Sequence, residues 1–219
     1  MSEFGKTDVK RIIVLALLLI WCVGMVAVRI ERTGSGYYRF LLGNLFLAGI
    51  PLFLSTGLRI ADRFKLHWIM KTGLFGLWLL FLPNAPYILT DILHLTRANH
   101  APVWYDLALL LSCAGTGLLF GYLSLIDVQT IVSRHYSVVV GWVFALVSLC
   151  LSGFAIYLGR FLRWNSWDVI TTPSLMLDLV GIVRHSQPIS VTFIFGIILV
   201  LGYISLRLLL DPASHRSQT

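Results

Sequence analysis

Three segments of the chain carry most of the residue types that could do chemistry. In the first, residues 87–94, Asp91 and His94 stand three positions apart. On an α-helix Tyr87, Asp91 and His94 share one stripe, because residues three and four apart are neighbours on the helix surface. A carboxylate and an imidazole in this arrangement can hold a divalent metal ion, or act as a general base with its orienting partner. The alternative is an ordinary ion pair of Asp91 with His94 or Arg97 at the level of the lipid headgroups.

The second segment is Trp104-Tyr105-Asp106, which directly precedes a long apolar run. Aromatic residues of this kind gather where a helix meets the membrane interface. Aspartate is also a favoured residue at the N-terminal cap of a helix. The segment therefore indicates an aromatic belt and a helix start, and Asp106 is also a candidate ligand-binding residue.

The third segment, residues 159–168, contains two arginines three positions apart, Arg160 and Arg163, followed by Asn165 and Asp168. Guanidinium groups present planar forks of hydrogen-bond donors that suit carboxylates and phosphates. The pair therefore predicts binding of an anionic ligand. Two alternatives stay open, namely an ion pair with an aspartate of the same chain and anchoring to lipid headgroups.

The composition indicates what kind of secondary structure positions these residues. Of 219 residues, 58% are hydrophobic and only 12% are charged, whereas soluble domains are about 45–50% apolar and about 25% charged. These two fractions exclude a disordered chain, a nucleic-acid-binding module and a cytosolic enzyme. The net charge of +7 comes from Lys and Arg at the ends of apolar runs, as membrane topology requires. The three cysteines form no metal-binding or disulfide pattern. The predicted fold is an all-α polytopic membrane helix bundle.

A helix needs roughly 20 apolar residues to cross the hydrocarbon of a bilayer. Six spans meet this requirement: 12–28, 40–58, 70–89, 107–126, 136–158 and 189–210. Arg29, Arg59 and Arg207 mark span ends, where we expect their charged groups to reach the interface. No soluble domain is expected, because the longest connection is too short to fold by itself. The first span is expected to stay uncleaved.

The third predicted span is interrupted by Pro83, Asn84 and Pro86. Each proline removes a backbone donor, so the helix is expected to break there. Freed carbonyl groups and an amide side chain are tolerated at this depth only against protein or a water-lined cavity, so we expect Asn84 to face the bundle interior. The apolar stretch 173–183 is too short to span, and it predicts a short helix on or in the membrane surface.

The distribution of Lys and Arg predicts that both termini are cytoplasmic. Four of these residues (Arg59, Arg63, Lys65 and Lys71) lie before or at the start of the third span, and only Arg97 follows it. With this orientation the three polar segments meet at the extracytoplasmic end.

The first functional hypothesis is a ligand-binding or catalytic site at this end, for an anionic or lipid-linked substrate. Asp91 and His94 are the candidates for catalysis and for any divalent metal. The candidate ligand-binding residues are Asn84, Asp106, Arg160, Arg163, Asn165 and Asp168. The alternatives are a non-enzymatic membrane scaffold with a protein partner, and a transporter. Gly117 and Gly121 allow close helix approach and are expected to shape the bundle.

Several of these segments together resemble one bacterial family of multi-pass membrane proteins, the family of unknown function numbered 1361. The resemblance is carried by the segments 81–95, 104–106 and 157–168. It extends over most of the chain from about residue 40 onward. It implies a bacterial cytoplasmic (inner) membrane location, and it supplies no activity or catalytic residue.

Overall fold

The computed structural model describes residues 2–97, 101–164, 168–171 and 186–210, and within these ranges all the regular structure is helical. Among these residues, six helices are long and apolar enough to cross a membrane, one of them built from α3, α4 and η2 together. The elements are α1 (Ser2–Thr33), η1 (Tyr37–Arg39), α2 (Phe40–Arg63), α3 (Trp68–Phe81), α4 (Asn84–Tyr87), η2 (Ile88–Arg97), α5 (Val103–His135), α6 (Val138–Phe161), α7 (Asp168–Thr171) and α9 (Ser186–Leu210). The predicted all-α polytopic bundle is confirmed.

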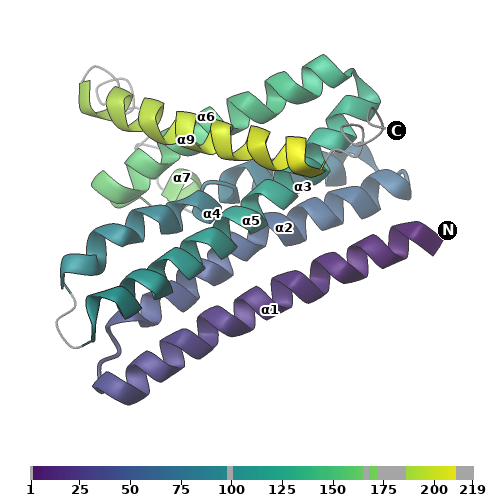
Figure 1. Ribbon diagram of the computed structural model, residues 1–219. Coiled ribbons are helices and arrows are strands. Elements are labelled where there is room, and N and C mark those ends of the chain that lie inside the picture. The colour runs from purple at the N-terminus through teal and green to yellow at the C-terminus, as the bar shows by residue number, and fades with distance from the viewer. Residues whose placement is uncertain (1, 98–100, 165–167, 172–185, 211–219) are drawn as a thin grey trace, which may run out of the picture.

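The spanning helices run alternately in opposite directions, so that the N- and C-terminal ends lie at one end of the bundle (Figure 1). We call this end the termini end; η2, the start of α5 and the end of α6 lie toward the opposite end. Helix α5 is central, because α1, α2, α6, α4 and η2 all pack against it. Helix α9 packs mainly on α6.

Glycines allow α5 to approach the broken third span closely. A Cβ atom on Gly117 would lie 2.8 Å from Ile88 Cδ1 and 2.9 Å from the Ala85 carbonyl oxygen. A Cβ atom on Gly121 would lie 2.7 Å from Ala85 Cβ. The expectation that these two glycines shape the bundle is confirmed.

The break in the third span occurs where the prolines predict it. Helix α3 ends at Phe81, and the chain continues after Pro83 as the single turn α4. The following segment, η2, is a 3₁₀-helix and not the α-helix assumed from the sequence. Residues three apart eclipse each other in a 3₁₀-helix, so Asp91 and His94 stay on one stripe. Tyr87 leaves that stripe, and its hydroxyl lies 3.5 Å from the Gly159 carbonyl oxygen.

Two spanning helices extend well beyond their predicted ends. Helix α1 continues past residue 28 to Thr33, and α5 continues past residue 126 to His135. The sequence suggested an end at the first charged residue, whereas the charge of Asp127 is accommodated inside α5 by partners on other helices. The predicted surface helix 173–183 lies outside the described residues.

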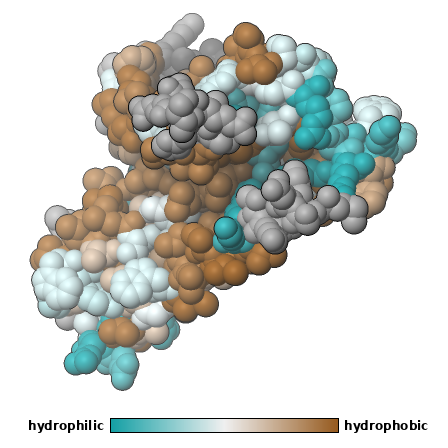
Figure 2. All heavy atoms as spheres, turned by 45° about the vertical axis from the view of Figure 1, so that its right-hand side comes forward, coloured by the Kyte–Doolittle hydropathy of each residue, from teal (hydrophilic) through white to brown (hydrophobic). Residues whose placement is uncertain are grey.

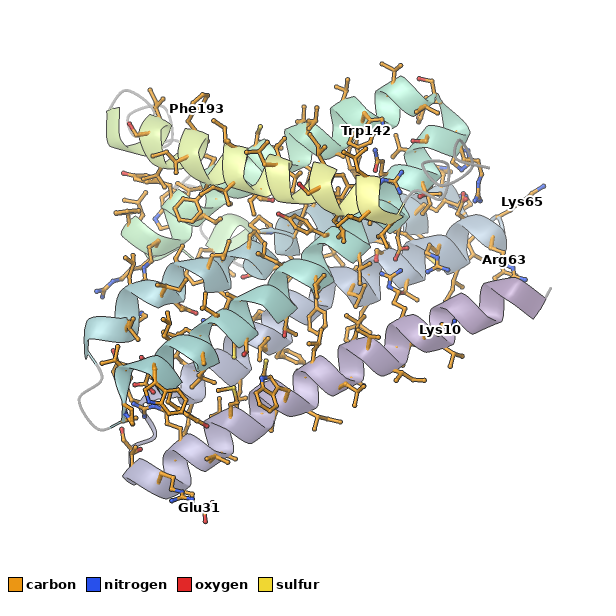
Figure 3. All side chains as sticks on the ribbon, viewed as in Figure 1. Lys10, Glu31, Arg63, Lys65, Trp142 and Phe193 are labelled. Carbon is orange, nitrogen blue, oxygen red and sulfur yellow. The ribbon has the colours of Figure 1, made fainter. Side chains whose placement is uncertain are left out.

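The surface has the polarity expected of a membrane protein. Hydrophobic residues cover the middle of the face in Figure 2, and hydrophilic residues gather toward its ends. Large apolar side chains are exposed on the spanning helices, for example Phe53 on α2 and Phe193 on α9. Figure 3 shows Lys10, Arg63 and Lys65 at the termini end. The apolar helices therefore indicate contact with the lipid bilayer.

Candidate polar site at the end opposite the termini

The buried carboxylate Asp91 lies where three spanning segments meet. Its residue is 1% exposed. Asn44 of α2 donates a hydrogen bond from Nδ2 to Asp91 Oδ2 at 2.7 Å. Arg160 of α6 forms an ion pair, with 3.5 Å between its Nη1 and Asp91 Oδ1. Asp91 on η2 therefore joins α2 and α6. Arg160 forms the ion pair with an aspartate of the same chain that was one of the alternatives for the two arginines.

His94 connects this ion pair to the protein surface. Its Nε2 lies 3.2 Å from Arg160 Nη1, and its Nδ1 lies 3.3 Å from the Tyr37 hydroxyl oxygen. A guanidinium group has only donors, so Nε2 must accept the hydrogen bond. His94 is therefore neutral with its proton on Nδ1, and that proton is donated to the Tyr37 oxygen.

Exposure increases along these contacts. We call Asp91, Arg160, His94 and Tyr37 the Asp91 chain. Asp91 is buried, the Arg160 side chain is 17% exposed and Tyr37 is 37% exposed. Because the Tyr37 oxygen accepts from His94, its own hydroxyl hydrogen is available to a group outside the protein. The Asp91 chain thus ends on a surface hydrogen-bond donor.

Arg160 lies against both residues that the sequence suggested as metal ligands, Asp91 and His94. Across the part of the chain that the structure describes, no three His, Cys, Asp or Glu side chains lie close enough together to hold a metal ion. The Arg160 guanidinium also occupies the position next to both Asp91 Oδ1 and His94 Nε2. A metal ion bound by these two residues would have to displace a positive charge.

Asp106 belongs to a separate and fully buried ion pair. Arg29 Nε and Nη2 donate to Asp106 Oδ1 and Oδ2 at 2.6 and 3.0 Å. Both side chains are 1% exposed, and the Arg29 guanidinium lies 4.4 Å from the Tyr38 ring centroid. Arg29 does not extend to the protein surface, because α5 supplies a carboxylate and η1 an aromatic face. Pro102, and not Asp106, is the N-cap of α5.

The remaining predicted residues are placed separately. Asn84 is half-buried on α4, and its Nδ2 donates to the Phe81 carbonyl oxygen at 3.0 Å. Arg163 is exposed just beyond α6, with a φ of 59°. Asp168 is the first residue of α7, and Asn165 lies outside the described residues. Of the predicted set, the structure brings together Asp91, His94 and Arg160.

Several polar residues that were not predicted as site residues form hydrogen bonds or ion pairs in the structure. Tyr37 is the exposed member of the Asp91 chain, and Asn44 donates a hydrogen bond to Asp91. Near the termini end, Asp127 accepts hydrogen bonds from both terminal nitrogens of Arg11 at 2.9 and 3.0 Å and from Ser55 Oγ at 3.2 Å. In the sequence, Asn44 and Asp127 could have been recognised because each is an isolated polar residue in or next to an apolar run.

Comparison with known proteins places the chain in a family. Residues 43–201 match the family model described as a protein of unknown function, DUF1361. No curated protein and no solved structure gave a match. The matched segment contains Asp91, His94 and Arg160, and it covers well over half of the chain. The chain belongs to the DUF1361 family of proteins of unknown function.

Proposed function

We propose that this protein resides in the bacterial cytoplasmic membrane and binds the anionic group of a lipid or lipid-linked molecule at its extracytoplasmic end. Tyr37 and Arg160 donate hydrogen bonds to a phosphate or carboxylate group, and the exposed Arg163 adds positive charge at the same end. Asp91 and His94 hold Arg160 and Tyr37 in position. Catalysis by Asp91 and His94 is a further prediction that ligand binding does not require.

The observation that carries this proposal is the gradient of exposure along the Asp91 chain. A fully internal ion pair, such as Arg29–Asp106, has no atom available to a ligand. The Asp91 chain instead leads from a buried carboxylate to a hydroxyl group on the surface. Arg160 and Tyr37 contact the two ring nitrogens of His94, and each has hydrogen-bond donors that suit an anion.

The surroundings favour a ligand that is partly embedded in the bilayer. The exposed side chains nearest in sequence to the site include Leu93 on η2 and Phe161 on α6. A ligand with a hydrocarbon part can bury these apolar groups while its anionic part meets Arg160. In membrane proteins Lys and Arg are enriched on the cytoplasmic side, so arginines at the extracytoplasmic end are unusual. Their presence there supports a role in binding an anion.

A second candidate function is a non-enzymatic membrane subunit that assembles with a protein partner. It is favoured by the ion pairs Arg29–Asp106, Arg11–Asp127 and Arg160–Asp91, each of which joins two different helices. Such pairs hold the helices of the bundle to one another through charged groups. Co-purification of a partner in fixed stoichiometry would favour this candidate over ligand binding.

The test is thermal unfolding of the detergent-purified protein, followed by tryptophan fluorescence. Three probes are compared: dioctanoyl-phosphatidylglycerol, dioctanoyl-phosphatidylcholine and inorganic phosphate. A ligand that binds only the folded state raises the apparent Tm in proportion to the logarithm of its concentration above Kd. We expect phosphatidylglycerol to raise the Tm more than phosphatidylcholine. A shift with inorganic phosphate alone would identify a soluble anion as the ligand.

The variant Tyr37→Phe removes the surface hydroxyl and keeps the aromatic ring. We expect it to lose most of the difference between the two lipids, while its Tm without lipid stays close to that of the wild type. Tyr136→Phe is the matched control, because Tyr136 is an exposed tyrosine near the termini end. The proposal fails if both lipids act equally, or if Tyr37→Phe responds as the wild type does.

A further inference from the structure

An apolar groove with a volume of about 490 Å³ lies between α6 and α9. Its walls are almost entirely apolar, and it is open to one side. Both walls belong to membrane-spanning helices, so the groove faces hydrocarbon and not water. The lining side chains used below are Cys150 and Phe154 of α6 and Ile189, Phe193, Ile197 and Leu201 of α9.

The groove exists because α6 and α9 approach each other closely at a glycine. A Cβ atom on Gly153 would lie 2.8 Å from the Thr192 carbonyl oxygen and 3.0 Å from the Gly196 backbone nitrogen. The helix backbones are therefore nearly in contact at this point. Larger side chains next to the contact, such as Phe154 and Phe193, form the walls of the groove.

The groove lies in the half of the membrane away from the termini. Helix α6 runs toward the end opposite the termini and α9 starts there, and Figure 3 shows Phe193 on the half of α9 that is distant from the termini end. The stretch from Ile189 to Leu201 rises about 18 Å. One leaflet contributes about half of the roughly 30 Å of hydrocarbon in a bilayer. The groove thus extends through one leaflet.

We propose that this groove binds one hydrocarbon chain of a phospholipid from the leaflet opposite the termini end. The groove is apolar along its whole length, and that length of about 18 Å corresponds to the hydrocarbon of one leaflet. An extended acyl chain matches both the apolar lining and this length.

The charge near the groove complements a phospholipid. Arg160 and Arg163 lie at the end of α6 toward which Cys150 and Phe154 lead, and Arg163 is exposed there. The inference goes beyond the proposed function and does not depend on it, because it concerns the position of a hydrocarbon chain and not the identity of the headgroup bound by the Asp91 chain.

The test uses the full-length protein in phosphatidylcholine nanodiscs that contain a phospholipid with a photoreactive diazirine in the middle of one acyl chain. After illumination, the labelled residues are mapped by mass spectrometry. We expect adducts at Cys150, Phe154 and Ile197 to be several-fold more frequent per residue than at Ile20 and Phe53, which are exposed on α1 and α2. Equal labelling at all exposed positions would show ordinary boundary lipid and overturn the proposal.

Two variants of α9 provide the second measurement. Ile197→Trp fills the groove, and Ile198→Trp is the matched control, because Ile198 has similar exposure and does not line the groove. We expect Ile197→Trp to reduce the adducts at Cys150 and Phe154 by at least half, and Ile198→Trp to leave them unchanged. Equal labelling in the two variants would contradict binding of a lipid chain in the groove.

Discussion

At the level of single residues, the charged groups inside the bundle are paired, but the pairs differ in their access to the surface. Burying an isolated charge costs several kcal/mol, and a buried carboxylate therefore needs a cation or several donors. Asp106 meets this need with Arg29 in a fully buried pair. Asp91 meets it with Arg160 and Asn44, in contact with a histidine that reaches the exposed Tyr37. The first pair is structural, and the second is the candidate for binding.

Asp106→Asn tests the structural role of the buried pair. The substitution leaves the Arg29 guanidinium buried without a counter-charge, so we expect it to lower the free energy of unfolding by about 3–5 kcal/mol. The double variant Arg29→Met/Asp106→Leu removes both charges and should recover most of this loss. The measurement is unfolding of the purified protein in mixed micelles with increasing denaturing detergent.

A small effect of Asp106→Asn, or a double variant as unstable as the single one, would contradict this role. Tyr37→Phe serves as the control from the exposed part of the bundle, because it removes no buried charge. It should leave the free energy of unfolding within about 0.5 kcal/mol of the wild type, as surface substitutions generally do.

The sequence could identify Asp91, His94 and Arg160 as candidates because charged and imidazole groups are rare in an apolar chain. It could not identify the partner of Asp106, since Arg29 is 77 residues away and meets it only through the packing of α1 on α5. Asn44 was missed for a related reason. Its contact depends on the rotation of α2 about its own axis, which hydropathy alone does not determine.

At the level of the elements, the third span combines a feature that the sequence predicts with one that it does not. Pro83 and Pro86 require a break in the helix, and α3 ends at Phe81 as expected. The change to a 3₁₀-helix from Ile88 onward has no comparable signal, because the segment contains no further proline or glycine. Its conformation depends on the packing of α4 and η2 against α5.

Gly117→Val tests the close approach of α5 and the broken span. The valine side chain would collide with Ile88 and with the Ala85 backbone, so the helices would have to move apart. We expect a loss of about 1–3 kcal/mol in the free energy of unfolding, as for other overpacked interiors. Unfolding in mixed micelles measures the effect.

Gly115→Ala is the matched control on the same helix. A Cβ atom at Gly115 meets nothing within 4 Å, and alanine is favoured over glycine in helices by about 1 kcal/mol. This variant should be as stable as the wild type or slightly more stable. If both substitutions were tolerated equally, Gly117 would not mark a close contact and the placement of α4 against α5 would be wrong.

At the level of the whole molecule, the helical membrane fold could be predicted because it depends on the length and hydropathy of each apolar run, and both are read from the sequence. The neighbours of each helix could not be predicted in this way. Lipid is as apolar as a leucine side chain, so hydrophobicity does not decide which helix faces pair; small residues and polar contacts do. The central position of α5 is consistent with this, since Gly117, Gly121 and Asp127 all lie on it.

The orientation of the molecule in the membrane determines on which side the Asp91 chain lies. An even number of spans puts both termini on one side, and Lys10, Arg63 and Lys65 are exposed at the termini end. Positive residues are retained on the cytoplasmic side. In a bacterial host we therefore expect a C-terminal green fluorescent protein fusion to fluoresce and a C-terminal alkaline phosphatase fusion to be inactive. Alkaline phosphatase inserted between residues 98 and 100 should be active. The reverse pattern would place the Asp91 chain on the cytoplasmic side, and an anionic ligand would then have to come from the inner leaflet or the cytoplasm.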